Sequence, residues 1–156
     1  MIDDILSWFA AGDGAATGTR RSRDELQLAL AALLVEAAQS DDHLDESERT
    51  VIIRLLERRF RIAQSQALSL LEKATHAADR SVELFRFTRT INERLTPPER
   101  IELIEMLWEV AYADGVLDKY EDSLLRRIGG LIYVADPERG LARQRVMKRL
   151  GIEEAE

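Results

Sequence analysis

Two short acidic stretches contain the side chains of this sequence that are best suited to chemistry. The first covers residues 41–48 and reads DDHLDESE, and the second covers residues 114–121 and reads DGVLDKYE. A further glutamate precedes each stretch by five residues. Oxygen-only clusters of carboxylates select hard cations such as Ca²⁺, Mg²⁺ or Mn²⁺. The candidate ligands of a divalent cation are therefore the eight carboxylates at matching places, Glu36, Asp41, Asp45, Glu48, Glu109, Asp114, Asp118 and Glu121.

Helix capping explains part of the same pattern without any ligand. In each stretch an aspartate stands three residues before a glutamate, which is the spacing of a capping box. Gly115, and Asp42 in the first stretch, suit the left-handed residue that ends a helix. Capping gives no role to Asp41 or Asp114, since acids at the end of a helix are disfavoured by about 0.3–1 kcal/mol each. Two interpretations stay open: capped turns with a solvated acidic face, and turns that hold at least one cation. The spacing does not fit an EF-hand.

Other residue types offer little for catalysis. The sequence has no cysteine, no phosphate-binding glycine loop and no Gly-x-Ser-x-Gly motif. His43 is matched by Val116 in the second stretch, and His76 has no acidic or nucleophilic neighbour in sequence, so neither histidine is expected to bind a metal. We therefore expect a non-enzymatic protein. The alternative is a metal-assisted hydrolase that uses the same carboxylates.

The elements that must position these acids are helices. From residue 24 onward apolar residues recur in steps of three and four, and the first such face comprises Leu26, Leu30, Leu33, Leu34 and Ala37. Thr96-Pro97-Pro98-Glu99 and Asp136-Pro137-Glu138 both predict the start of a helix. No segment alternates with a period of two for long. The sequence therefore predicts an all-α fold of about seven helices.

The two acidic stretches belong to an internal repeat with an offset of 73 residues. Apolar and acidic positions match together, so shared helical periodicity alone does not explain the register. The matched pairs include Leu30 with Leu103, Leu34 with Leu107, Glu36 with Glu109, Leu44 with Leu117, Arg54 with Arg127, Phe60 with Tyr133, and Leu68 with Leu141. We expect two pseudo-symmetric helical-hairpin units, about 28–76 and 101–149, around one core, because one unit cannot bury its own apolar face.

The chain divides into a short N-terminal piece and one helical domain. Residues 1–19 are predicted to form a short amphipathic helix, with its apolar side from Ile2 to Phe9, and a flexible linker at 12–19 that is rich in glycine and alanine. We expect the helix to dock on the domain or on a neighbouring copy. Asp3 and Asp4 at its start argue against a helix that lies on a membrane surface. Residues 20–156 are predicted to form the domain.

Composition narrows the classes of partner and compartment. The chain has 156 residues, 46% hydrophobic residues and a net charge of −7. This composition excludes an intrinsically disordered chain and makes binding to nucleic acid unfavourable. Of the two basic stretches, 54–61 and 139–149, the first is interpreted as an exposed helix face, because Arg54, Arg58 and Arg61 recur on one side. No apolar run approaches a membrane span, and the acidic start is unlike a secretory signal. We expect a cytoplasmic protein that does not insert into a membrane.

The helix that ends Glu109-Val110-Ala111-Tyr112-Ala113-Asp114-Gly115, followed by Leu117-Asp118 and Glu121, resembles the signature of the TerB-like family. This family includes the tellurite-resistance protein TerB and the N-terminal region of a membrane-anchored DnaJ-type co-chaperone. The resemblance covers about residues 25–150. The first stretch departs from the pattern at Asp42, where glycine is expected, and at His43.

The resemblance implies a function as well as a fold. It implies an all-helical domain with internal pseudo-symmetry and a role in a bacterial response to tellurite and other stress, alongside membrane-associated and Ca²⁺-binding protein partners. By position, the family's metal-binding or charged interaction site corresponds to the same eight carboxylates. No His-Pro-Asp tripeptide occurs, so the chain carries no J-domain. The expected protein is a module that presents a duplicated acidic face to a partner, at the inner side of a membrane where that partner is membrane-bound.

Overall fold

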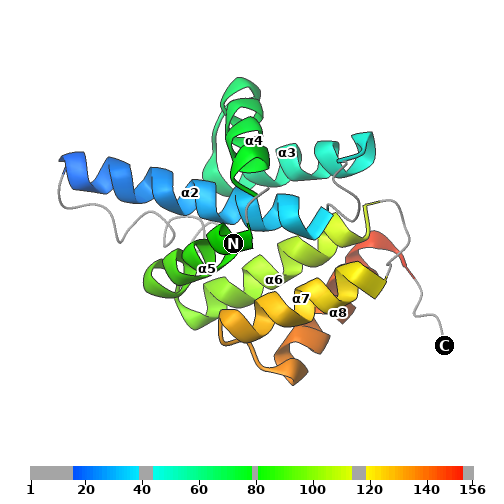
Figure 1. Cartoon of the computed structure of the whole chain (residues 1–156). Helices are drawn as coiled ribbons and strands as arrows, with labels where there is room; N and C mark the ends of the chain where they lie inside the picture. The colour runs from blue at the N-terminus through cyan, green and yellow to red at the C-terminus, as the bar shows by residue number, and fades with distance from the viewer. Residues whose placement is uncertain (1–15, 39–43, 79–80, 114–118, 153–156) are drawn as a thin grey trace.

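The computed structural model describes residues 16–38, 44–78, 81–113 and 119–152 (Figure 1). Within these ranges the chain forms seven helices and no strand. They are α2 (Ala16–Ala38), α3 (Glu46–Phe60), α4 (Gln64–Ala78), α5 (Ser81–Arg94), α6 (Pro97–Ala111), α7 (Lys119–Leu131) and α8 (Asp136–Leu150). The predicted all-α class is confirmed. None of these helices combines the length and apolar character that a bilayer-spanning helix requires.

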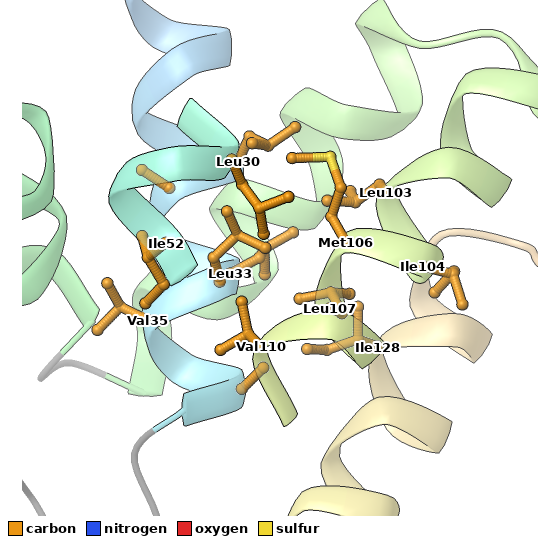
Figure 2. Close-up of a cluster of buried hydrophobic side chains, with 14 of the residues drawn as sticks. Leu30, Leu33, Val35, Ile52, Leu103, Ile104, Met106, Leu107, Val110 and Ile128 are labelled. Atoms are coloured by element: carbon orange, nitrogen blue, oxygen red, sulfur yellow. The ribbon is translucent and has the colours of Figure 1, made fainter. Parts of the chain in front are cut away.

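Helices α2 and α6 form the centre of the molecule. Helix α2 packs on α4, α5 and α6, and α6 packs on α8 and α2 (Figure 1). Leu30 and Leu33 of α2 lie in one cluster with Met106 and Leu107 of α6 and Ile128 of α7 (Figure 2). From Leu26 onward α2 is buried on most of its circumference, and so is α6 apart from its glutamates, as expected for helices covered on several sides. The fully or nearly fully buried residues of α6 are Leu103, Ile104, Met106, Leu107, Trp108, Val110 and Ala111.

Two helix starts follow the chemistry that the sequence predicts. The Thr96 side chain accepts a hydrogen bond from the Glu99 amide, and Glu99 accepts one from the Thr96 amide at 2.7 Å, which completes a capping box with proline in the first turn. Helix α8 starts at Asp136 as predicted, but the residue before it is Ala135, whose side chain cannot cap. Proline near its N-terminus starts this helix without a side-chain cap.

The N-terminal linker is shorter than predicted. Helix α2 begins at Ala16, so residues 16–19 are helical rather than part of a flexible connector. Alanine, the residue type at position 16, has the highest helix propensity. One glycine near a helix start costs only about 1 kcal/mol, so the composition of this segment is compatible with a helix. The rest of the predicted linker and the predicted amphipathic helix, residues 1–15, lie outside the described residues.

Helix boundaries follow the 73-residue offset in the first two helices of each predicted unit. Helices α2 and α6 end at Ala38 and Ala111, and α3 and α7 begin at Glu46 and Lys119. The packing partners also correspond, because α2 packs on α4 as α6 packs on α8. Superposition of the two halves in space stays a prediction.

The offset fails after the second helix of each unit. Phe60 is 3% exposed, whereas its predicted counterpart Tyr133 is 78% exposed. Helix α7 ends at Leu131, two residues before the position that matches the end of α3. The residues with left-handed backbone are Arg61 (φ 52°) and Tyr133 (φ 60°), which are 72 residues apart. Helix α7 is two residues shorter than α3 and the loop after it is one residue longer, so the second unit has one residue fewer before α8. The register therefore shifts by one residue, and the Phe60–Tyr133 pairing is wrong.

Candidate functional site

Half of the eight predicted ligands have described side chains. These are Glu36, Asp45, Glu48 and Glu109. Asp41, Asp114 and Asp118 lie outside the described residues, and Glu121 is described only in its backbone, within α7. Within the described part of the chain, no group of three or more histidine and acidic side chains is arranged to hold a metal ion. A cation site therefore stays a prediction that depends on the acids outside those ranges.

The first acidic stretch ends in a capping box, as the capping interpretation predicts. The amide of Glu48 donates a hydrogen bond to Oδ1 of Asp45 at 2.8 Å, and the amide of Asp45 donates one to Oε1 of Glu48 at 3.1 Å. The hydroxyl of Ser47 donates to the same Asp45 oxygen at 2.8 Å. The Glu48 amide, followed by the Ser47 hydroxyl, holds the pKa of Asp45 below its ordinary value. Capping therefore accounts for both acids that end the first stretch.

Glu109, by contrast, pairs with cations of two neighbouring helices. It accepts a hydrogen bond from Nη2 of Arg149 in α8, and Nη2 of Arg58 in α3 lies 3.7 Å from its Oε2. Its side chain is only 12% exposed, which strengthens these interactions relative to surface pairs. Glu36, the matching residue of the first unit, is partly buried near the end of α2. Glu109 therefore balances positive charge on α3 and α8 in the described structure.

Glu109 is one of three glutamates on α6 that pair with arginines. Glu105 lies 2.9 Å from Arg149 and 3.1 Å from Arg145, both on α8. Glu102 lies 3.1 Å from Arg59 on α3. Burial lowers the pKa of Arg149, but its hydrogen bonds to Glu105 and Glu109 outweigh burial and raise the pKa above its ordinary value. The basic stretch 54–61, which the sequence suggested as an exposed face, and the stretch 139–149 therefore contribute arginines that join α3 and α8 to α6.

A groove lies between the ends of α3, α6 and α8. It has a volume of about 710 Å³, which is within the usual range of roughly 300–1,000 Å³ for ligand pockets. The first two turns of α3, the end of α6 and the residues that end α8 line it, namely Glu46, Ser47, Thr50, Val51, Arg54, Glu109, Tyr112, Ala113, Leu150 and Ile152. Residue 46 directly follows the Asp45 cap, and Ala113 directly precedes Asp114. The structure therefore brings the end of the first acidic stretch and the residue that precedes the second stretch to the same groove.

Sequence reasoning did not anticipate this groove. The repeat indicated that the two stretches occupy matching places, but no periodic signal showed that Leu150 and Ile152 of the C-terminal helix end would close the third side. The most direct available signal was Leu150 itself, an apolar residue next to Arg149 and before Gly151, which ends α8 with φ 72°.

Tyr112, which lines the groove, belongs to a small aromatic cluster. Trp108 is completely buried, and its ring stacks on Tyr112 with 5.9 Å between centroids. Arg143 of α8 lies over the Trp108 ring at 5.4 Å and donates a hydrogen bond from Nε to the Tyr112 hydroxyl at 2.8 Å. This cluster fixes the end of α6 against α8, immediately before the second acidic stretch.

Comparison with known proteins gives one match. No curated protein and no solved structure matches the chain. The family model described as tellurite resistance protein TerB matches residues 27–144, a range that extends from α2 into α8 and includes both acidic stretches. This match covers well over half of the chain and agrees with the all-helical architecture and with the acidic motifs. The chain belongs to the TerB family.

Proposed function

We propose that this chain is a non-enzymatic interaction module of the bacterial response to tellurite and related stress. In this proposal the groove end of the molecule, with both acidic stretches beside it, presents an acidic face to a protein partner. The observation that carries the proposal is that Glu46, which belongs to the first stretch, and Ala113, which directly precedes the second, line one groove. Family membership supports the link to tellurite resistance.

The proposed partner is a stress-response protein, membrane-associated in the simplest case, and the chain would then act in the cytoplasm at the inner face of the membrane. A basic partner surface fits, because carboxylates on both sides of the groove would steer it electrostatically. The chain itself is not proposed to insert into the bilayer or to bind nucleic acid. No observation on the described residues favours the alternative hydrolase.

A divalent cation forms the second part of the proposal. Since Asp45 and Glu48 are engaged in capping and Glu109 pairs with arginines, the principal ligands would be Asp41, Asp114, Asp118 and Glu121. A cation held there would place positive charge on the acidic face and present open coordination positions to carboxylates of the partner.

Paired charge reversals test the interaction. The double variant Asp114→Lys with Asp118→Lys should abolish recovery of partners in pull-downs. When it is expressed in a strain that lacks the gene, it should also fail to restore survival in the presence of tellurite. The matched control, Glu72→Lys with Glu138→Lys, makes the same change in net charge at exposed positions outside the groove and should behave as the wild type. Wild-type recovery and survival for the first variant, with unchanged helicity, would overturn the proposal.

Calorimetric titration of the metal-free chain with Ca²⁺, Mg²⁺ and Mn²⁺ tests the cation separately. Binding that disappears in Asp114→Asn with Asp118→Asn supports the cation site. Silence at millimolar metal removes the cation and leaves the interaction test unaffected.

A further inference from the structure

One side of the groove is apolar and has no described cover. Leu150 is 45% exposed, although it is a large aliphatic residue, and Val51 and Ile152 are partly buried beside it. Exposed apolar surface inside a concave site is characteristic of a surface that binds another segment. This side is formed by α3 and by the end of α8.

The charge around this apolar side favours a carboxylate. Arg54 is exposed at the groove and forms no ion pair with another described residue. Glu109 is compensated by Arg58 and Arg149, so its charge does not offset Arg54. Glu46, the other acid that lines the groove, lies in the first turn of α3, where the helix dipole partly balances it. A fitting occupant therefore carries bulky apolar side chains with a carboxylate next to them.

The chain itself contains a segment with this composition. Residues 3–9 read DDILSWF and combine two aspartates with Ile5, Leu6, Trp8 and Phe9. No other stretch of the sequence outside the described residues combines aromatic and aliphatic side chains in this way. We propose that residues 3–9 of one copy occupy the groove of a second copy, with the apolar side chains on Val51, Leu150 and Ile152 and an aspartate at Arg54.

Chain length favours a second copy over the same copy. The 23 residues of α2 extend for roughly 34 Å at 1.5 Å per residue. Its first residue lies at one end of the molecule, whereas the start of α3 and the ends of α6 and α8 lie near its other end (Figure 1). The seven peptide steps from Phe9 to Ala16 cover at most about 25 Å when fully extended. Phe9 therefore cannot reach the groove of its own copy.

This inference goes beyond the proposed function, because it concerns the apolar side of the groove and requires neither a cation nor Asp114 and Asp118. Occupation of the groove by a second copy would also limit access of another partner to the same end of the molecule. Self-association would then compete with partner binding, and the local concentration of the protein would set the balance.

Sedimentation of the full chain over a wide range of concentrations tests the proposal. The wild type should self-associate, whereas Trp8→Ala with Phe9→Ala and, separately, Leu150→Glu should weaken association at least about ten-fold, as for loss of an anchor at an interface. The matched control is Leu141→Glu, also on α8 and 54% exposed but outside the groove, which should associate as the wild type. Far-UV circular dichroism verifies that each variant is folded.

Complementation makes the test specific. The segment variant retains an intact groove, and the groove variant retains an intact segment, so a mixture of the two should form a mixed complex through the one contact that survives. Arg54→Glu should weaken association, and Asp3→Lys with Asp4→Lys in the same chain should restore it.

Four results of the association and fluorescence measurements would overturn the proposal. They are a wild type that stays monomeric at millimolar concentration, association that both variants retain, a mixture that fails to form the mixed complex, and a monomer whose Trp8 fluorescence already reports burial. Binding of the wild type to anionic vesicles that depends on Trp8 but not on Leu150 would assign the segment to a membrane and would also overturn it. Cation binding and partner recovery by the Leu150→Glu variant report on the proposed function independently.

Discussion

Arg143 donates a hydrogen bond from its Nε to the hydroxyl of Tyr112 over 2.8 Å. The donor belongs to α8, and the acceptor is the C-cap residue of α6. The bond therefore fixes a residue that lies two positions before the second acidic stretch. The guanidinium of Arg143 also covers the ring of Trp108, and the contact therefore combines a hydrogen bond with a cation–π interaction.

Removal of this hydroxyl should measurably destabilise the protein. Tyr112→Phe keeps the ring on Trp108 but leaves Nε of Arg143 without its partner, so we expect a loss of about 0.5–1.5 kcal/mol in the free energy of unfolding. The control is Tyr133→Phe, which removes the same atom from a side chain that is 78% exposed and should change stability by less than about 0.5 kcal/mol. Urea unfolding followed by circular dichroism distinguishes them, and equal midpoints would contradict the role of the bond.

The Asp45 cap should make part of the stability dependent on pH. Because hydrogen bonds to the carboxylate lower the pKa of Asp45 in the folded protein, its contribution is complete above the ordinary value of 3.8 and is lost as the pH falls through the lower folded value. Asp45→Asn should keep most of the cap at neutral pH, since asparagine is an equally good N-cap, but should unfold with a weaker dependence on acid.

Asp45→Ala completes this comparison. It should lose about 1 kcal/mol at neutral pH, because it removes the cap itself. Thermal unfolding of the three proteins between neutral pH and pH 3 provides the measurement. Identical acid dependence in the wild type and Asp45→Asn would show that the capping box does not carry the effect.

The arginines that flank α6 should contribute stability that depends on salt. Arg149→Met retains the aliphatic stem but removes both pairs, with Glu105 and Glu109, and we expect a loss of about 1 kcal/mol or less at low ionic strength. The loss should shrink in molar salt, because screening weakens such pairs. Arg54→Met serves as the control, because Arg54 pairs with no other described residue, and its effect should be small at either salt concentration.

Glycine should have opposite effects at two positions, one directly after α3 and one inside it. Arg61 has φ 52°, and the left-handed conformation costs an L-residue about 1–2 kcal/mol, part of which is offset by the greater flexibility of unfolded glycine, about 0.5–1 kcal/mol. Arg61→Gly should therefore stabilise the protein by about 0.5 kcal/mol. Arg54→Gly, inside the same helix, should destabilise it by about 1 kcal/mol. A shift in the same direction for both variants would contradict this assignment of backbone strain.

Local signals in the sequence predicted most of the fold. Apolar spacing placed the helices, and the capping chemistry of Thr96 and Asp45 placed two of their starts, because each depends on residues within one or two turns. The offset of the repeat also predicted matching ends for α2 and α6. It failed at Phe60 and Tyr133, because the second unit has one residue fewer before α8, which changes the direction of every later side chain and leaves few local traces.

The site was harder to predict than the fold. Sequence spacing indicated the Asp45–Glu48 pair, but it did not show that Glu109 would be balanced by Arg58 and Arg149. Those arginines lie 51 and 40 residues from Glu109, and only tertiary packing brings them together. The groove has the same origin, since α3, α6 and α8 each contribute one side.

The mutual covering of α2 and α6 has a consequence for how the chain can be divided. A fragment that ends after α5 would expose the apolar surface of α2 that α6 covers. A fragment that begins at α6 would likewise expose the apolar surface that α2 covers. Neither fragment should be soluble by itself, whereas co-production of both should reconstitute a stable, non-covalent heterodimer. The two halves should therefore unfold together as one cooperative unit, because each half covers the apolar central helix of the other.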